Sequence, residues 1–134
     1  MSTVKPPKNP EQNPRVKAVF DDIRATRNTE FVGNIWRYLA FDPGLLENVW
    51  LDVKSVMSES SHLDQKTKEM IYVAVSIANA CSYCIHSHTA AAKAAGMSDD
   101  EHAELLRIVS LAAKTNHIMT SMQVPVDSAF DASA

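Results

Sequence analysis

The stretch EMIYVAVSIANACSYCIHSH, residues 69–88, limits the fold more than any other part of the 134-residue chain. Its first half, residues 70–80, is an apolar run with only three polar residues, Tyr72, Ser76 and Asn79. A segment that is apolar on nearly all sides must be buried, and both a strand and a helix satisfy that condition. The length of the run and its alanine content favour a helix. We therefore expect residues 70–80 to lie in the central, buried helix of the protein.

Apolar residues at spacings of three and four recur outside this run, and they predict further helices. On the N-terminal side they cover residues 14–27, a short segment around 35–40 and a longer one over 45–57. On the C-terminal side, a helix from about residue 83 would end at Gly96. Ser98 and Glu101 then form a capping box that opens a last helix towards residue 122. We predict an all-α fold, a compact bundle of about six helices that assembles into an oligomer.

The domain organisation follows from where this periodicity begins and ends. Residues 1–13 contain three of the six prolines and no apolar periodicity, so they are expected to form a flexible N-terminal arm. Residues 14–122 are predicted to be a single helical domain, long enough to bury a core without disulfides. Residues 123–134 are expected to be a loose C-terminal tail. Both tryptophans, Trp36 and Trp50, are expected in the core or at a subunit interface.

Charge and hydropathy exclude several classes of function. The net charge is -3 and the lysines and arginines are scattered, which gives no electrostatic case for binding nucleic acid. No apolar run approaches the roughly 20 residues that a membrane-spanning helix needs. The N-terminal sequence MSTVKPPKNP is polar and proline-rich, unlike a secretory signal. We therefore expect a cytoplasmic protein that binds neither nucleic acid nor a membrane.

The two cysteines, Cys81 and Cys84, form a C-x-x-C pair, which can close a tight disulfide or share a metal. At the N-terminus of a helix, unpaired backbone N–H groups and the helix dipole favour thiolate over thiol, so we expect depressed pKa values for the pair. On a helix that begins near residue 83, His88 lies about 40° around from Cys84 and one turn further on. The imidazole can then reach the sulfur, directly or through a water, and remove its proton.

Glu69 is the carboxylate of the buried helix, and the sequence does not fix whether it lies close to the cysteines. It lies some 16 Å of helical rise before the end of that helix. It can meet the cysteines if the next helix folds back alongside, or if a partner chain brings its own site close. Four other histidines remain. His86 faces another side of its helix, and the other three have no partner at helical spacing, so we interpret all four as structural or surface residues. They are His62, His86, His102 and His117.

The pattern E-x11-C-x2-C-x3-H, formed by Glu69, Cys81, Cys84 and His88, resembles the alkylhydroperoxidase D-like branch of the carboxymuconolactone decarboxylase family. The surrounding sequence, KEMIYVAVSIANACSYCIHSHTAAAKAAGMS, is similar to the core motif of that family. The upstream sequence FVGNIWRYLAFDPGLLENVW resembles the family less closely. The resemblance implies an all-helical fold that assembles as homotrimers or homohexamers. It also implies peroxidase activity on hydroperoxides, in antioxidant defence, with no metal and no cofactor.

By the same resemblance, peroxide would oxidise Cys84 to a sulfenic acid, and Cys81 would be its disulfide partner. An external dithiol or a thiol reductant protein would meet Cys81, the more accessible of the two. Glu69 and His88 would form the proton relay. One position departs from the pattern, because well-studied members have a histidine between the cysteines where this chain has Tyr83. A tyrosine with an ordinary pKa near 10 is a poor base at neutral pH.

Other functions use the same residues. The nearest is a general thiol–disulfide oxidoreductase or redox sensor, for which peroxide is not the substrate. A zinc-binding structural protein would use Cys81, Cys84 and one or two histidines, and it would need a fourth ligand from elsewhere. A non-enzymatic interaction module would leave the cysteines without a chemical role. Lactone decarboxylation is disfavoured, because the decarboxylase branch of the family that the chain resembles lacks the cysteine pair.

Overall fold

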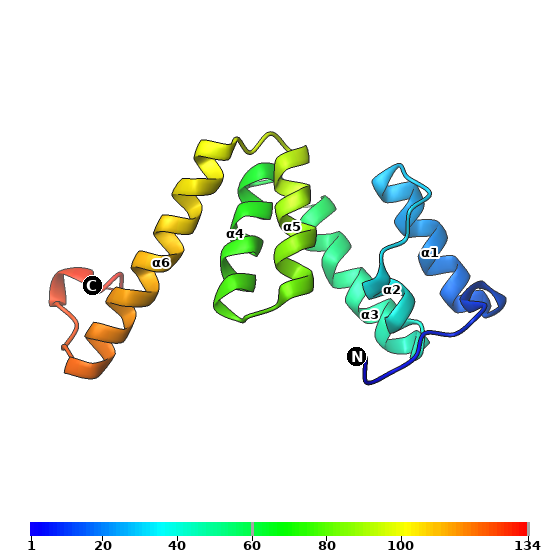
Figure 1. The fold of residues 1–134 in the computed structure, drawn as a ribbon, viewed down its shortest axis with the longest axis horizontal. Helices are drawn as coiled ribbons and strands as arrows, with labels where there is room; N and C mark the ends of the chain where they lie inside the picture. Colours follow the sequence, from blue (N-terminus) through cyan, green and yellow to red (C-terminus); the bar gives the residue numbers. More distant parts are fainter. Residues whose placement is uncertain (60, 134) are drawn as a thin grey trace. The chain divides into compact units, whose positions relative to one another are not determined.

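A computed structural model describes residues 1–59 and 61–133 (Figure 1). In chain order the α-helices are α1 (Pro14–Arg27), α2 (Asn34–Leu39), α3 (Pro43–Val53), α4 (Gln65–Ala78), α5 (Ser82–Ala94) and α6 (Asp99–Met122). Two 3-10 helices, η1 (Pro10–Gln12) and η3 (Ser128–Phe130), and a π-helical segment, η2 (Lys54–Glu59), complete the elements. The described residues contain no strand. The prediction of an all-α fold with about six helices is confirmed.

The contacts of the chain define two compact units, Met1–His62 and Leu63–Ala134, and each is described by itself. The first unit contains α1, α2 and α3, and the second contains α4, α5 and α6. The prediction of one domain over residues 14–122 stays a prediction.

The core of the first unit is built around the two tryptophans, as expected from the sequence. Trp36 of α2 and Trp50 of α3 are both buried, and their rings meet edge to face with centroids 5.3 Å apart. The guanidinium of Arg27 lies over both rings. The indole N–H of Trp50 donates a 2.7 Å hydrogen bond to Asp22 of α1, which satisfies its only polar atom. The other buried residues of this core are Val16, Val19, Phe20, Ile23, Val32, Ala40 and Leu46.

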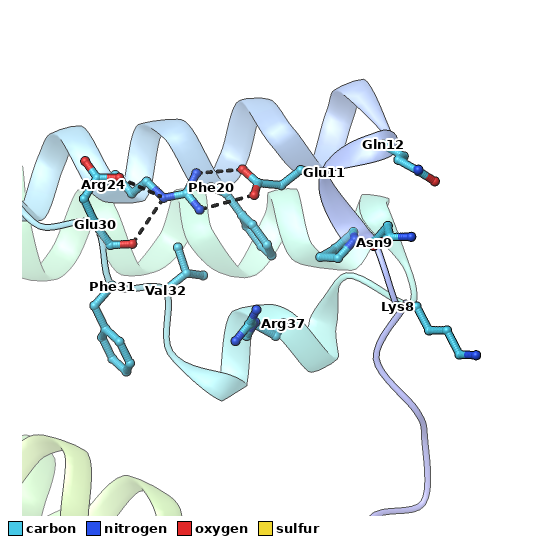
Figure 2. Close-up of a pocket in the computed structure, with 11 residues that line it drawn as sticks. Lys8, Asn9, Glu11, Gln12, Phe20, Arg24, Glu30, Phe31, Val32 and Arg37 are labelled. Atoms are coloured by element: carbon cyan, nitrogen blue, oxygen red, sulfur yellow. Dashed lines mark hydrogen bonds and ion pairs between the residues drawn. The ribbon is translucent and has the colours of Figure 1, made fainter.

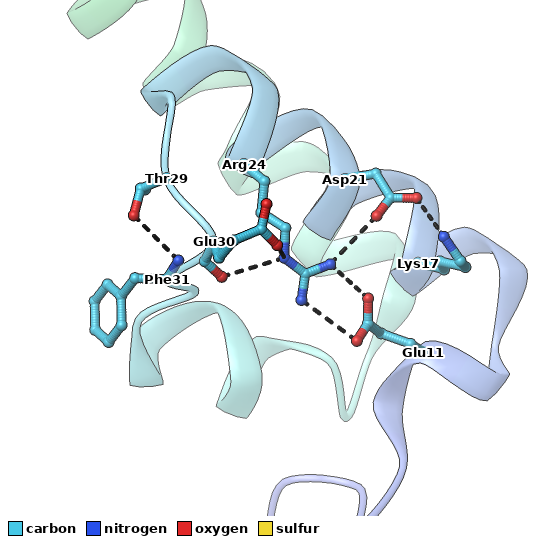
Figure 3. Close-up of polar contacts among 7 residues, drawn as sticks. All are labelled: Glu11, Lys17, Asp21, Arg24, Thr29, Glu30 and Phe31. Atoms are coloured by element: carbon cyan, nitrogen blue, oxygen red, sulfur yellow. Dashed lines mark hydrogen bonds and ion pairs between the residues drawn. The ribbon is translucent and has the colours of Figure 1, made fainter.

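Polar contacts join the segment before α1 to that helix (Figure 3). Arg24 of α1 forms an ion pair of 2.7 Å with Glu11 of η1 and one of 3.2 Å with Asp21. It also donates to the backbone carbonyl oxygen of Glu30. Within the expected N-terminal arm, residues 10–12 therefore form a helical turn that is paired to α1.

The second unit is a helical hairpin of α4 and α5 with α6 packed against α4 (Figure 1). Its core contains Val73 of α4, Ala92 of α5, Leu105 of α6 and Met97 of the α5–α6 connection. The predicted capping box at the start of α6 is confirmed. Asp64 accepts a 2.7 Å hydrogen bond from the N–H of Thr67 at the start of α4.

The prediction that residues 70–80 form a helix buried on nearly all sides is wrong in part. Val73 is fully buried, whereas Ile71 and Val75 are 49% and 52% exposed. The reason is that α5 and α6 cover only part of the circumference of α4. Among the described residues, no helix is both long and apolar enough to cross a membrane.

Candidate active site

The turn between α4 and α5 places the C-x-x-C pair at a helix N-terminus. Helix α4 ends at Ala78, and Ala80 then takes the left-handed conformation with φ of 54°. The N–H of Cys81 donates a 3.0 Å hydrogen bond to the carbonyl oxygen of Ser76, which closes the turn. A non-glycine residue in this conformation costs roughly 1–2 kcal/mol. The chain reverses here, so α5 returns alongside α4.

Cys81 is the N-cap of α5. Its Sγ accepts a hydrogen bond from the backbone N–H of Cys84, with 3.4 Å between nitrogen and sulfur. A hydrogen bond from the side chain of Cys84 and this backbone bond lower the pKa of Cys81, while burial opposes the shift. These donors stabilise a thiolate, in the way that an N-cap carboxylate is stabilised. The expected depression of the pKa is therefore found at Cys81.

The pKa of Cys84 moves the other way, so the expectation of a depressed pKa is wrong for this residue. Burial, together with the hydrogen bond to Cys81 and the negative charge of Cys81, raises the pKa of Cys84 to about 11. Two close sulfurs cannot both ionise easily, because the second charge is repelled by the first. Both cysteines are free thiols in this structure. The reduced pair therefore carries its first negative charge on Cys81.

Glu69 meets His88 within the same chain, which settles the question that the sequence left open. The fold-back of α5 brings the Nδ1 atom of His88 to 2.6 Å from Oε2 of Glu69. The other carboxylate oxygen of Glu69 accepts a 3.0 Å hydrogen bond from the side-chain amide of Gln65. Glu69 is only 6% exposed. With Nδ1–H donating to this carboxylate, the lone pair of the neutral imidazole is on Nε2.

Tyr72 is a site residue that the sequence reasoning missed. Its ring stacks on the imidazole of His88, with centroids 3.7 Å apart and planes 20° apart. Burial raises the pKa of Tyr72, and the charges of Cys84, Glu69 and Cys81 add to the shift. The available signal was spacing, because Tyr72 follows Glu69 by three residues and so lies on the same face of α4.

The remaining histidines are not part of this pair, and Tyr83, between the cysteines, is 44% exposed. The Nδ1 atom of His86 lies 2.8 Å from the carbonyl oxygen of Ser82 on its own helix, and the residue is exposed. His62 and His117 are exposed, and His102 is half-buried in the first turn of α6. In the part of the chain that the structure describes, no group of three or more His, Cys, Asp or Glu side chains is arranged to hold a metal ion.

A separate open pocket of about 660 Å³ lies in the first unit (Figure 2). Charged and apolar side chains from η1, α1, α2 and the α1–α2 connection line it, including Arg24, Phe31 and Arg37. None of the four predicted site residues lines this pocket.

Comparison with known proteins places this arrangement in a family. The sequence model of the carboxymuconolactone decarboxylase family matches residues 45–127. The chain belongs to the carboxymuconolactone decarboxylase family. Among solved structures, the crystal structure of the alkylhydroperoxidase AhpD core from Rhodospirillum rubrum is similar, with 59% sequence identity and a TM-score of 0.92. The match covers 97% of this chain and 97% of that one. A comparison with curated proteins found no match.

The family resemblance inferred from the E-x11-C-x2-C-x3-H pattern is thereby confirmed. Together, the family and the similar structure suggest an alkylhydroperoxidase-type function. In this member of the carboxymuconolactone decarboxylase family, the structure brings Glu69 and His88 into contact and sets Cys81 and Cys84 at the start of the helix that carries His88.

Proposed function

We propose that this protein is a thiol-dependent peroxidase that reduces organic hydroperoxides through Cys81 and Cys84. The observation that carries the proposal is the 2.6 Å contact between Glu69 and His88, one helical turn beyond Cys84. A buried carboxylate that holds one nitrogen of an imidazole leaves the other nitrogen to act as a base. The similarity to an alkylhydroperoxidase AhpD core supports the same activity.

The raised pKa of Cys84 explains why a base is needed. With a pKa of about 11, roughly one Cys84 in 10⁴ is a thiolate at pH 7, and the thiolate is the nucleophile. In the proposed mechanism, Nε2 of His88 takes the proton from the thiol, directly or through one water. The Glu69 carboxylate holds the ring through Nδ1 and stabilises the imidazolium that forms.

The first chemical step oxidises Cys84 and reduces the peroxide. The sulfur of Cys84 attacks one oxygen of the O–O bond, so an S–O bond forms and the O–O bond breaks. The departing alkoxide takes the proton held by His88 and leaves as an alcohol. Cys84 is left as a sulfenic acid.

The second step uses the thiolate of Cys81. Its sulfur attacks the sulfenic sulfur of Cys84, the S–O bond breaks as the disulfide forms, and the hydroxide leaves as water with a proton from solvent, which replaces the one that Cys81 released on ionising. The lowered pKa of Cys81 raises the fraction of this attacking sulfur that is ionised. An external dithiol, or a thiol reductant protein, then attacks the sulfur of Cys81 and restores the reduced pair by exchange.

The test is turnover of an organic hydroperoxide with a dithiol reductant. Cys84→Ser should abolish turnover. Cys81→Ser, treated with the hydroperoxide in the absence of the dithiol, should consume one equivalent and accumulate a sulfenic acid that dimedone traps. Glu69→Gln keeps the shape of the side chain and removes its charge, so it should lower kcat/KM by about 10²-fold. His86→Asn, an exposed histidine of the same helix, serves as the matched control and should leave turnover unchanged. Undiminished turnover in Cys84→Ser would refute the proposal.

A general thiol–disulfide oxidoreductase is the second candidate. The lowered pKa of Cys81 at the N-cap favours it, because thiol–disulfide exchange requires an accessible thiolate. The rates at which a hydroperoxide and a simple disulfide oxidise the reduced protein separate the two functions. Faster oxidation by the disulfide would favour this second candidate.

A further inference from the structure

The ring of Tyr72 lies against the imidazole of His88 in a nearly parallel stack. The centroids are 3.7 Å apart and the planes differ by 20°. Glu69 and Tyr72 are three residues apart on α4, so one helix presents both groups to the same imidazole. His88 itself comes from the neighbouring helix α5.

The contact with Glu69 alone does not fix the ring of His88. A hydrogen bond at Nδ1 sets the position of one atom, and the imidazole can still tilt about that bond. A second group that lies flat against the ring removes this freedom. Glu69 and Tyr72, both on α4, then together fix the position of Nε2 of His88.

We infer that Tyr72 is a positioning residue, whose stacked ring holds the imidazole of His88 in the orientation that presents Nε2 for proton transfer from Cys84. The inference rests on the proposed function, in which Nε2 is the base. Proton transfer requires a heavy-atom distance near that of a hydrogen bond, and a displacement of about 1 Å can cost about 10²-fold in rate. The raised pKa of Tyr72 keeps its phenol protonated, so the ring adds no charge beside Glu69.

The experiment separates the ring from the hydroxyl group. Tyr72→Phe keeps the stacked ring and should keep kcat/KM within about threefold of the native value. Tyr72→Leu keeps apolar volume without an aromatic ring, and Tyr72→Ala removes both. Each should lower kcat/KM for an organic hydroperoxide by about 10-fold to 100-fold. Tyr72 is 37% exposed, so none of these changes opens a cavity in the core, and helical content is checked by circular dichroism.

The matched control is Val75→Ala, which truncates another partly exposed side chain of α4. It should leave turnover unchanged. A loss in Tyr72→Phe as large as that in Tyr72→Ala would overturn the inference, because the hydroxyl group would then be the active part. Native turnover in both Tyr72→Leu and Tyr72→Ala would also overturn it.

A second measurement does not depend on turnover. Carbon NMR relaxation of labelled histidine, assigned with His88→Asn, reports the motion of the His88 ring. The native protein and Tyr72→Phe should both show a rigid ring, and Tyr72→Ala should show a mobile ring, although the Nδ1 contact with Glu69 remains. A ring in Tyr72→Ala as rigid as that of the native protein would refute the positioning role. If the native protein shows no peroxidase turnover, the proposed function fails, and this measurement still decides the role of Tyr72.

Discussion

Cys81 and Cys84 are separated by two residues, yet their pKa values shift in opposite directions. Cys81 occupies the N-cap and receives the hydrogen bonds of its neighbour, whereas Cys84 lies within the first turn and is more buried. The same hydrogen bond stabilises the thiolate of one sulfur and the protonated form of the other. The two residues are therefore suited to different steps, because Cys84 is harder to ionise than Cys81 and depends more on a base.

The opposite shifts lead to a prediction at the residue scale. Cys81→Ser removes the charged neighbour of Cys84 and leaves its burial unchanged. The pKa of Cys84 should therefore fall below about 11 but stay above its ordinary value. The thiolate fraction of Cys84 at a given alkaline pH should rise accordingly. Ultraviolet absorbance of the thiolate during a pH titration measures this change.

The control for that titration is Cys84→Ser, in which Cys81 keeps the backbone N–H donor of position 84. The midpoint of Cys81 should remain below that of an ordinary cysteine, because the hydroxyl group of the new serine can also donate. A Cys84 midpoint that stays at about 11 in Cys81→Ser would contradict the coupling between the two sulfurs.

At the scale of elements, the α4–α5 hairpin is what assembles the site. The left-handed residue Ala80 reverses the chain, and the two helices then run side by side over the length that separates Glu69 from His88 (Figure 1). Helix α6 supports this hairpin, because Leu105 packs into the core of the second unit. The stability of the site therefore depends on α6, and with it on how the first turn of α6 is capped.

Ser98 caps α6 through a reciprocal capping box with Glu101, with bonds of 3.0 Å and 2.8 Å. Ser98→Ala leaves backbone N–H groups of the first turn without this acceptor, so the free energy of unfolding should fall by about 1 kcal/mol. Urea denaturation measures the change. Ser110→Ala, in the exposed middle of the same helix, is the matched control and should cause little change. Equal effects of the two substitutions would show that the cap contributes nothing specific.

At the scale of the whole molecule, the second unit leaves apolar surface uncovered. An apolar groove of about 280 Å³ between α4 and α6 includes Ile71 and Ile108, and both side chains are largely exposed. Further along α6, Leu111 and Met122 are also exposed. Continuous apolar surface of this kind is typical of a subunit interface.

This surface supports the proposal that the chain forms an oligomer, and the family resemblance implies a homotrimer or homohexamer. Light scattering at micromolar concentration should give the mass of three or six chains. Ile108→Glu places a charge in the groove and should shift the protein towards monomer, whereas Lys114→Glu, at an exposed polar position of α6, should do so less. A native monomer under these conditions would rule out the oligomer.

Periodicity and spacing in the sequence predicted the helices, the capping box of α6 and three proposed site residues, Cys81, Cys84 and His88, whereas Glu69 entered through the family resemblance. The helices and the capping box depend on spacing within one or two turns, such as that of Ser98 and Glu101, so the sequence encodes them directly. Only the tertiary structure decided that Glu69 meets His88, since 19 residues and a chain reversal separate them. It also decided that Tyr72 stacks on the imidazole, that α4 is partly exposed, and that Cys84 is the harder sulfur to ionise. Burial and packing between helices set these properties, and the spacing of residues along the sequence does not determine them.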